Sequence, residues 1–467
     1  MGRQFVRRWP IKNLIVMVIC CTAGSAVHAM DLAQAWQLAL NYDATYAAAR
    51  SQYRASMQKQ PQALAGLLPQ VDGTLTGAYL DSRATGPLNQ VYNSGRSAWT
   101  LTLTQPIFNW SAIQTFEQSK LVVASAEVQL QLAYQDLLLR VSQAYFDTLT
   151  AQDTLEALRA ELQSVQEQLA ASKQRFELGA ATVTDALEAQ ARFDLVSANI
   201  IAAENDLRNT EDALARIVGR QPPPGSLFAL PYNVQIPGPM PNKLEDWSQQ
   251  ASLANLEVVR ARIQTRISEY DVQIAKSGHY PSVSLTASST SNTVGNSQVR
   301  PFYSGRTIDN SVGVTLSVPI YSGGRVSANV VEKAELQQKS VYDLEAVRRR
   351  SIQLSREYFN GVRAGLARIQ GLQAAEKSSL SALTANLTGY QVGVRINLDV
   401  LNAQQQLFVT KRDLARARYQ TVMSGLRLRA NSGVLAEADL MTINTLLRPP
   451  GSPGTGIVHD LKLPRSR

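Results

Sequence analysis

The sequence contains very little cysteine and histidine. Its two cysteines, Cys20 and Cys21, are adjacent, and only three of the 467 residues are histidine. Both cysteines lie in an apparent targeting segment, so the processed chain would hold no thiol, which excludes disulfides and cysteine-ligated metals. P-loop and G-x-S-x-G motifs are also missing. We therefore expect no catalytic residue, no metal site and no cofactor, and interpret the protein as not an enzyme.

Long apolar runs are missing after Met30. Residues 1–29 combine a basic start, the apolar run "LIVMVICCTAG" and the small-residue end "AVHA". This pattern predicts a signal peptide cleaved after about Ala29. The alternative, a retained anchor helix, is disfavoured because the apolar run is short. Beyond Met30 no run approaches the ~20 apolar residues that a membrane helix needs. An exported chain of this kind would have to enter a membrane with strands.

Aromatic residues and excess charge are also scarce. Aromatics make up 7% of the chain, which is rich in Ala, Gln, Leu and Ser. That composition favours long helices with thin interfaces over a thick globular core. Removing the four basic residues of the signal peptide lowers the formal charge from +9 to +5. Part of the remainder lies on a Pro- and Gly-containing tail from about residue 448, which we predict to be disordered. The charge therefore gives no support for a nucleic-acid partner.

What the sequence does contain is an internal duplication. The stretch "GAATVTDALEAQ", which begins at Gly179, returns as "GVRINLDVLNAQ", which begins at Gly393. Three more matches have nearly the same spacing: "LPQVDGTLT" with "YPSVSLTAS", "LTLTQPIF" with "VTLSVPIY", and "AYFDTL" with "EYFNGV". Asn41 and Asn255 are separated by the same distance along the chain as the two glycines. A fixed offset over so many positions indicates two structural repeats.

The repeats set the predicted domain organisation. We expect a first repeat over 30–220, a proline-rich linker over 221–243, a second repeat over 244–433 and a C-terminal segment over 434–467. Each repeat should open with one helix of about 37 residues, followed by two strands, a long helix and a further short helix. The predicted strands are 70–82, 96–107, 281–293 and 309–320, the long helices 111–178 and 324–391, and the later short helices 182–218 and 397–432.

The long helix has the clearest pattern. From Leu130 to Phe176, apolar or small residues alternate at spacings of four and three without a break. Such a heptad seam predicts a coiled-coil helix. A helix over 111–178 would be roughly 100 Å long at ~1.5 Å per residue. Two short helices stacked end to end would match that length, which suggests a helical cylinder crossed at mid-height by the linker.

The predicted strands alternate in polarity with period two, as in "SAWTLTLTQ" and "NSVGVTLSV". Runs of ~10 such residues match tilted outer-membrane strands. The alternative is a half-buried sheet in a soluble protein. Four membrane strands cannot close a barrel, and an open edge is not tolerated in lipid. Two chains would give eight strands around a filled interior, and three would give twelve around a lumen.

Together these motifs resemble the TolC family of trimeric outer-membrane export channels, from about Asp31 to Leu447. The resemblance is carried by "QPIF", "VPIYSGG", "RFELGAATVTDALEAQ" and "GYQVGVRINLDVLNAQ". It implies a mixed α and β membrane protein: a long α-helical coiled-coil barrel continuous with a 12-stranded β-barrel formed by three chains, with four strands from each. The implied location is the outer membrane, with the tunnel projecting into the periplasm. The implied partners are two further copies of the chain, outer-membrane lipid, a periplasmic adaptor protein, and an inner-membrane efflux pump or ABC transporter.

The two repeated stretches that begin at Gly179 and Gly393, here called the Gly frames, would then be hairpins at the far end of the tunnel. Gly179 and Gly393 suit the position after a helix end, where a positive φ is favoured. Thr182 and Asn397 are candidate N-caps. The resemblance implies that Asp399 forms a ring that narrows the pore, with Asn402 at the site of a second ring and Glu188 in the matching slot of the first repeat. It also implies a closed-state latch made by Tyr390, Arg395, Thr184 and Asp185.

The predicted function is export of drugs, toxins or polypeptides through a passive conduit docked to a transporter and its adaptor. The alternative is a secreted, non-pore coiled-coil scaffold of the cell envelope. The strands discriminate between the two, because a scaffold has no use for four alternating segments of membrane length. Nothing in the sequence distinguishes one cargo from another.

Overall fold

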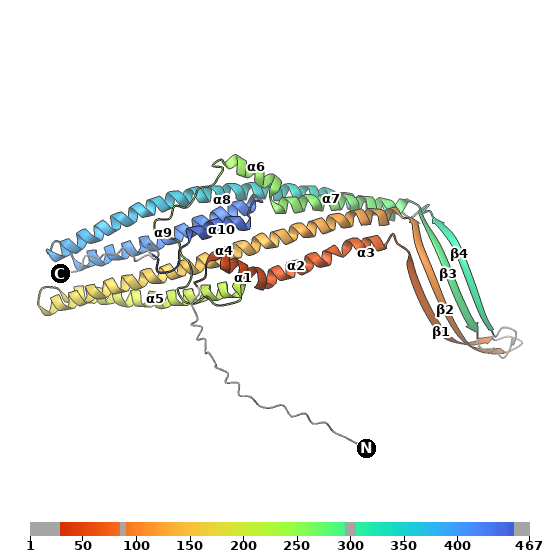
Figure 1. Ribbon diagram of the computed structural model, residues 1–467, viewed down its shortest axis with the longest axis horizontal. Helices are drawn as coiled ribbons and strands as arrows, with labels where there is room; N and C mark the ends of the chain where they lie inside the picture. The colour runs from red at the N-terminus through yellow and green to blue at the C-terminus, as the bar shows by residue number, and fades with distance from the viewer. Residues whose placement is uncertain (1–28, 85–89, 295–304, 453–467) are drawn as a thin grey trace, which may run out of the picture.

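The computed structural model describes residues 29–84, 90–294 and 305–452. The predicted signal peptide lies outside this part of the chain except for Ala29. Two rods dominate the described part: α4 (Trp110–Glu177, 68 residues) and α8 (Arg325–Gln391, 67 residues). Each is roughly 100 Å long at about 1.5 Å per residue. Figure 1 shows both rods running nearly the full length of the helical part, with the sheet at one end.

Shorter helices lie along each rod in two consecutive sets, one towards the sheet and one towards the far end. At mid-height lie α1 (Leu32–Tyr42) and α6 (Leu244–Ala254). From there α2 (Ala44–Met57), α3 (Lys59–Ala65), α7 (Leu256–Lys276) and the short 3-10 helix η1 (Ser277–His279) lead on to the sheet (Figure 1). At the far end lie α5 (Val183–Val218) and α9 (Asn397–Asn431). Helix α5 packs on α4, and α9 packs on both α8 and α4. The far half is therefore a row of four helices in the order α5, α4, α9, α8 (Figure 1).

The opening helix of each repeat is broken, which corrects the prediction of one continuous helix there. Asp43 separates α1 from α2, and Asn255 separates α6 from α7. Each leaves the helical conformation and caps the next helix: the Asp43 carboxylate accepts from the Tyr46 N–H at 2.7 Å. Asn255 accepts at 2.9 Å from an N–H two residues on. The cap role thus pairs Asn255 with Asp43 of the first repeat rather than with Asn41.

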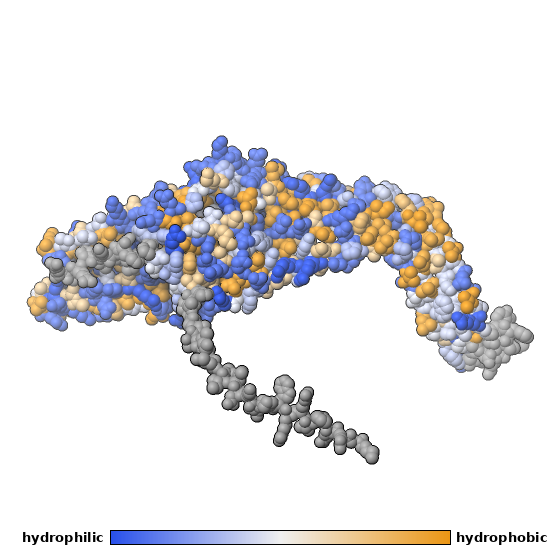
Figure 2. All heavy atoms as spheres, viewed as in Figure 1, coloured by the Kyte–Doolittle hydropathy of each residue, from blue (hydrophilic) through white to orange (hydrophobic). Residues whose placement is uncertain are grey.

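The strands β1 (Gln70–Ala84), β2 (Gln90–Phe108), β3 (Ser282–Val294) and β4 (Gly305–Ser317) form one antiparallel sheet in that order. Strand β2 begins before its predicted start, and β4 begins and ends earlier than predicted. The pairing of β2 with β3 joins the two repeats. Figure 2 shows hydrophobic residues gathered on the sheet and around its junction with the helices. Among the described residues, no helix is both long and apolar enough to cross a membrane.

The main hydrophobic core lies at mid-height, where the linker crosses the helices. Met30 pairs with Leu227 in a parallel bridge, and Arg448 pairs with Ala229 in an antiparallel one. The hydroxyl of Tyr145 on α4 lies within 3.1 Å of the carbonyl oxygens of Met30 and Phe228. The predicted disordered tail therefore begins too early, because Arg448 is held by the linker. A short helix that was not predicted from the sequence, α10 (Glu437–Leu446), also packs into this core.

Candidate functional site

Two hairpins close the far end of the helical row. Gly179 follows α4 with a φ of +70°, and Gly393 follows α8 with a φ of +78°. The N–H after each glycine donates back to a helix carbonyl: Ala180 to Arg175 and Val394 to Gly389, both at 2.8 Å. This is the Schellman arrangement, which needs a left-handed residue at the glycine position. Glycine is therefore required at both turns by backbone geometry alone.

The two hairpins start their second helices in different ways. In the first, Thr182 caps α5: its hydroxyl accepts from the Asp185 N–H at 3.2 Å, and the Asp185 carboxylate accepts from the Thr182 N–H at 3.0 Å. The second hairpin has no such capping box, the pair of reciprocal bonds that Thr182 and Asp185 make in the first. The prediction that Asn397 is an N-cap is wrong, because Ile396 holds the cap position and Asn397 is the first residue of α9.

Asn397 is fully buried and joins the two hairpins instead. Its side-chain oxygen accepts from Gln168 Nε2 on α4 at 2.6 Å. Its Nδ2 donates to the backbone carbonyl of Asp185 at 2.9 Å. One amide therefore connects α9 with both α4 and α5. The start of α9 and the start of α5 consequently lie at the same level of the row.

Among the described residues, no hydrogen bond or ion pair joins the predicted latch residues to one another within one chain. Arg395 pairs with Asp399 at 3.5 Å, and the Asp185 carboxylate bonds Thr182. The Tyr390 hydroxyl is buried, and the described part of the chain offers it no hydrogen-bond partner. Its ring lies under the guanidinium of Arg175, 4.5 Å from the ring centre. Thr184 is exposed. The side chains are thus grouped at one end of the molecule without forming the latch.

The predicted constriction residues lie on the same helices. Asp399 and Asn402 are one turn apart on α9, and Glu188 is half-buried on α5. Asn402 accepts from Arg192 of α5 at 3.3 Å. Arg192 was not among the site residues predicted from the sequence. Its only signal was the departure from the repeat, since "AQAR" in the first copy becomes "AQQQ" in the second. Among the described residues there is no cluster of three or more acidic, histidine or cysteine side chains that could hold a metal.

Above the hairpins, two acidic side chains on α4, the half-buried Asp153 and the buried Glu161, lie near arginines on α9. Burial raises the pKa of Asp153 to about 7, against the lowering effects of a hydrogen bond from Tyr419 at 3.0 Å and of the Arg418 charge. Burial also raises the pKa of Glu161, which Arg412 opposes. These groups lie on the seam where the helices of the first repeat pack on those of the second. The two halves of the row are thus held by polar interactions as well as by apolar packing.

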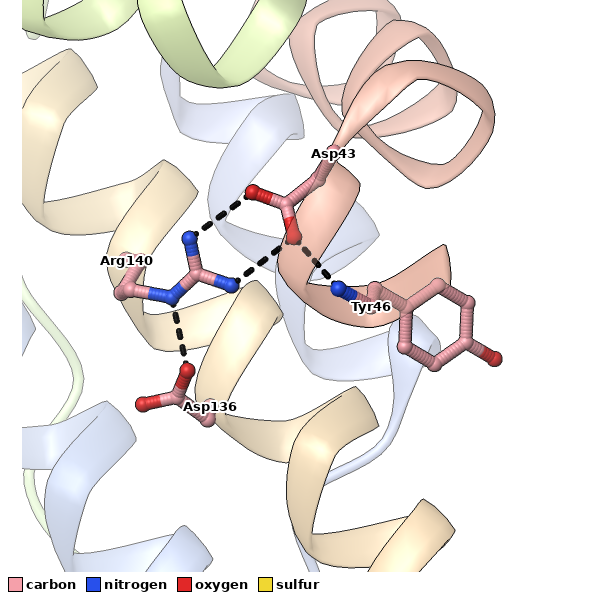
Figure 3. Close-up of polar contacts among 4 residues, drawn as sticks. All are labelled: Asp43, Tyr46, Asp136 and Arg140. Atoms are coloured by element: carbon pink, nitrogen blue, oxygen red, sulfur yellow. Dashed lines mark hydrogen bonds and ion pairs between the residues drawn. The ribbon is translucent and has the colours of Figure 1, made fainter. Parts of the chain in front are cut away.

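A second polar cluster lies at mid-height, where α2 begins (Figure 3). Arg140 of α4 donates two hydrogen bonds to the Asp43 carboxylate, at 2.9 and 3.1 Å, and a third to Asp136 at 2.6 Å. The bonds from Arg140 hold the pKa of Asp43 below its usual value, while burial opposes them. A bidentate pair of this kind fixes both distance and orientation. It fastens the break between α1 and α2 to the long helix.

The link made by Asn397 gives a first prediction. Asn397→Leu keeps a similar volume but leaves Gln168 Nε2 and the Asp185 carbonyl without a partner. An unsatisfied buried polar group costs about 1–3 kcal/mol. We expect faster amide hydrogen exchange over 168–190 and at the start of α9, with exchange at mid-height unchanged. The control is Asn402→Leu, which removes an exposed amide and should leave exchange near the wild-type rate. Equal exchange in wild type and Asn397→Leu would contradict the link.

Known proteins of similar sequence match both repeats of this chain. The family model described as outer membrane efflux protein matches residues 35–220 and 247–434. The chain is 31% identical over 435 residues to the outer membrane protein TolC of Vibrio cholerae, covering 93% of this chain and 98% of that protein. It is 30% identical to the proteases secretion protein PrtF of Dickeya chrysanthemi, covering 92% and 94%.

The fold is also found in solved structures. The crystal structure of the outer membrane protein VceC of Vibrio cholerae matches with a TM-score of 0.71 at 19% identity, covering 86% of this chain and 96% of that chain. These likenesses confirm the predicted family and the mixed α and β channel fold, and they give no support to the scaffold alternative. The chain belongs to the outer membrane efflux protein family, and it is an outer-membrane channel of the TolC type that serves efflux and secretion.

Proposed function

We propose that three copies of this chain form one conduit: a 12-stranded β-barrel in the outer membrane that continues into a periplasmic helical tunnel. The observation that carries the proposal is the open sheet. Within the described residues β1 pairs only with β2, and β4 pairs only with β3. An unpaired strand edge is not tolerated in lipid, so the edges must be covered by neighbouring copies. Twelve strands leave a lumen, whereas eight are filled by side chains.

Apolar side chains on the two edge strands support insertion into lipid. Leu75 on β1 is 83% exposed and Val312 on β4 is 77% exposed in the single chain. Val71, Tyr79, Val314 and Leu316 on the same strands are exposed as well. Exposed apolar surface of this extent marks contact with a membrane or with another chain. Lipid on one face of the sheet and sister copies at its edges would cover these residues.

The hairpin end of the tunnel would dock, through a periplasmic adaptor protein, with an inner-membrane efflux pump or ABC transporter. Two features support this. The rods extend roughly 100 Å from the sheet, far enough to reach deep into the periplasm. PrtF is named for the secretion of proteases, and the same architecture suits drugs, toxins and polypeptides as cargo. Copurification of the tagged channel from its native membrane, followed by identification of bound proteins, tests these partners.

Planar-bilayer recording tests the conduit itself. The purified protein should have a native mass of three copies and should give discrete single-channel steps. A protein that remains a single copy and gives no conductance would overturn the proposal and would favour the scaffold alternative.

The predicted constriction gives a prediction for the same recordings. Three Asp399 carboxylates around one axis would concentrate cations at the hairpin end. We expect Asp399→Ala to weaken block by a divalent cation added on the periplasmic side, by on the order of ten-fold. Asn402→Asp, which adds a second acidic ring, should strengthen the block. Unchanged block in both variants would show that these positions do not face the lumen.

A further inference from the structure

The two outermost helices of the far half have no neighbour on one side within the described chain. Helices α4 and α9 lie inside the row, whereas α5 and α8 lie at its opposite edges (Figure 1). The inner face of α5 packs on α4 through Ala189 and Ala203. The inner face of α8 packs on α9 through Ile369 and Leu383. The faces opposite to these are open in the single chain.

The open faces have complementary shapes. On α5, the open face carries large apolar side chains: Ile201 is 71% exposed, and Leu187 is exposed as well. On α8, the residues at the matching heptad positions are all small and all exposed. They are Ala364, Ala367, Gly371, Ala374, Ser378, Ser381, Ala385 and Thr388. Small residues allow the backbone of another helix to approach closely, and larger side chains on that helix can fill the space above them.

The two helices also carry exposed charges of opposite sign, on these faces or on the sides next to them. Between Gly361 and Gln391, helix α8 exposes three basic side chains, and its one acidic residue there, Glu376, is buried. Helix α5 exposes three acidic side chains and two arginines. None of these exposed charges forms an ion pair within the described residues. The exposed charges are Arg363, Arg368 and Lys377 on α8, and Asp194, Asp206, Asp212, Arg208 and Arg216 on α5.

The charges also lie at matching heights above the hairpins. Because Asn397 joins the hairpins at one level, height can be measured from Val183 up α5 and from Gln391 up α8. Each residue along a helix adds about 1.5 Å. By this measure Asp206 and Arg368 stand at the same height, roughly 35 Å above the hairpins.

Two further pairs stand closer to mid-height. Asp212 lies at roughly 44 Å on α5, and Arg363 lies at roughly 42 Å on α8. Above them the signs are exchanged between the helices. Arg216 lies at roughly 50 Å on α5, and the exposed Glu357 lies at roughly 51 Å on α8.

Nearest to the hairpins, Asp194 of α5 and Lys377 of α8 differ in height by roughly 5 Å, which a lysine side chain can span. Arg208 of α5 and Arg356 of α8 are exposed and have no opposite charge at their own height on the other helix. Four of the five exposed charges on α5 therefore have an opposite charge on α8 within roughly 5 Å of their own height.

We propose that these faces form the interface between copies, with α5 of one copy seated on the small-residue face of α8 of the next. Four ion pairs fix the height at which the helices meet: Asp194 with Lys377, Asp206 with Arg368, Asp212 with Arg363, and Arg216 with Glu357. The partner is a second copy of this chain, so the inference rests on the proposed three-copy conduit. It adds which faces meet, in which register, and why the order is head-to-tail. A contact of α8 with α8 would oppose rows of like charge, which is destabilising.

Disulfide trapping tests the register, because the sequence predicts no cysteine in the processed chain. Ile201 stands at roughly 27 Å on α5, and Ala374 stands at roughly 26 Å on α8. We expect the double variant Ile201→Cys with Ala374→Cys to give covalent trimers under mild oxidation. The two positions lie on opposite edges of one chain, so any bond must join different copies. Disulfides need Cα atoms within about 7 Å.

The matched control is Ile201→Cys with Thr388→Cys. Thr388 lies on the same face of α8 but stands roughly 22 Å closer to the hairpins than Ile201 does on α5, so no covalent trimer is expected. Native mass distinguishes a wrong assignment of the interface from the absence of a three-copy conduit. Intact trimers without the bond between positions 201 and 374, or with equal bonding in the control, would overturn the interface and leave the conduit standing. Single copies in native mass measurements of the cysteine-free chain would overturn the conduit itself.

Charge reversal tests the ion pairs. Arg368→Asp should lower the trimer-to-monomer ratio in detergent about two- to five-fold per contact, as expected for exposed ion pairs. Adding Asp206→Arg, at the same height, should restore the ratio. Adding Asp194→Arg instead supplies the same charge roughly 18 Å lower on α5 and should not restore it. Equal rescue by both second changes, or no effect of the first, would overturn the assigned pairs.

Discussion

Replacing Arg140 with alanine is expected to loosen the joint between α1 and α2 by about 2–4 kcal/mol. Asp43 is buried, and Arg140 is the cation that bonds it. Removing one member of a fully buried pair costs about 3–5 kcal/mol, because a buried charge is left uncompensated. The Arg140 side chain is 31% exposed, so water would enter and reduce that cost. The free energy of local opening, measured by hydrogen exchange at the Tyr46 amide, checks the value.

The matched control is Arg159→Ala, which removes an exposed pair with Glu204 and should cost less than about 1 kcal/mol. The pH dependence gives a second check. Since Arg140 holds the pKa of Asp43 below its ordinary value of about 3.9, the pair stabilises the folded protein above that value. The contribution is lost as pH falls through the lowered pKa. The difference between wild type and Arg140→Ala should therefore shrink below about pH 4, and a difference that grows there would contradict the pair.

The long-range architecture could be predicted because it depends on periodic patterns. The unbroken heptad seam of α4 and the repeat of the Gly frames need no tertiary information. The helix breaks at Asp43 and Asn255 were missed because both residues sit inside otherwise helical sequence. Each break is stabilised by distant partners: Arg140 bonds Asp43, and the Asn431 carbonyl accepts from Asn255 Nδ2 at 2.7 Å. A cap supported from another helix leaves no local signal.

In the hairpins, too, features set by neighbours in sequence were predicted, and features set by distant residues were not. Gly179, Gly393 and Thr182 were identified correctly as turn or cap residues, since Schellman turns and capping boxes involve only neighbours in sequence. Asn397 was assigned by the same local rule, and the assignment was wrong. Gln168, from the long helix of the other repeat, and the Asp185 carbonyl bind its amide instead. At Asn397 a buried tertiary contact therefore outweighs the local preference of asparagine for the N-cap position.

The proposed interface also brings the predicted latch residues of neighbouring copies to the same height. Tyr390 is the last residue but one of α8, and Thr184 is the second residue of α5. In the register set by the four ion pairs, Tyr390 of one copy would stand level with Thr184 of the next. Tyr390 itself packs beside Leu383 on the inner face of α8, and its buried hydroxyl lacks a partner in the described chain, so a bond to the next copy requires this side chain to turn outwards. A latch between copies would explain why the single chain does not form it.

Replacing Tyr390 with phenylalanine and Arg395 with serine together is therefore expected to open the tunnel. In three copies six groups would be lost. At about 0.2–1 kcal/mol for each contact, they amount to roughly 1–6 kcal/mol. Since about 1.4 kcal/mol is a factor of ten in an equilibrium, the closed-to-open ratio should fall by on the order of ten-fold or more. Single-channel conductance should rise several-fold in planar bilayers.

Lys173→Ser is the matched control for this result. Lys173 is an exposed cation close to the first hairpin, and it bonds Gln190 of its own chain at 3.2 Å. Its removal changes the local charge without touching the faces that meet between copies, so its conductance should stay at the wild-type value. The double variant must also keep the native mass of three copies, because loss of assembly would lower conductance for an unrelated reason. Wild-type conductance from intact double-variant trimers would mean that Tyr390 and Arg395 do not hold the tunnel closed.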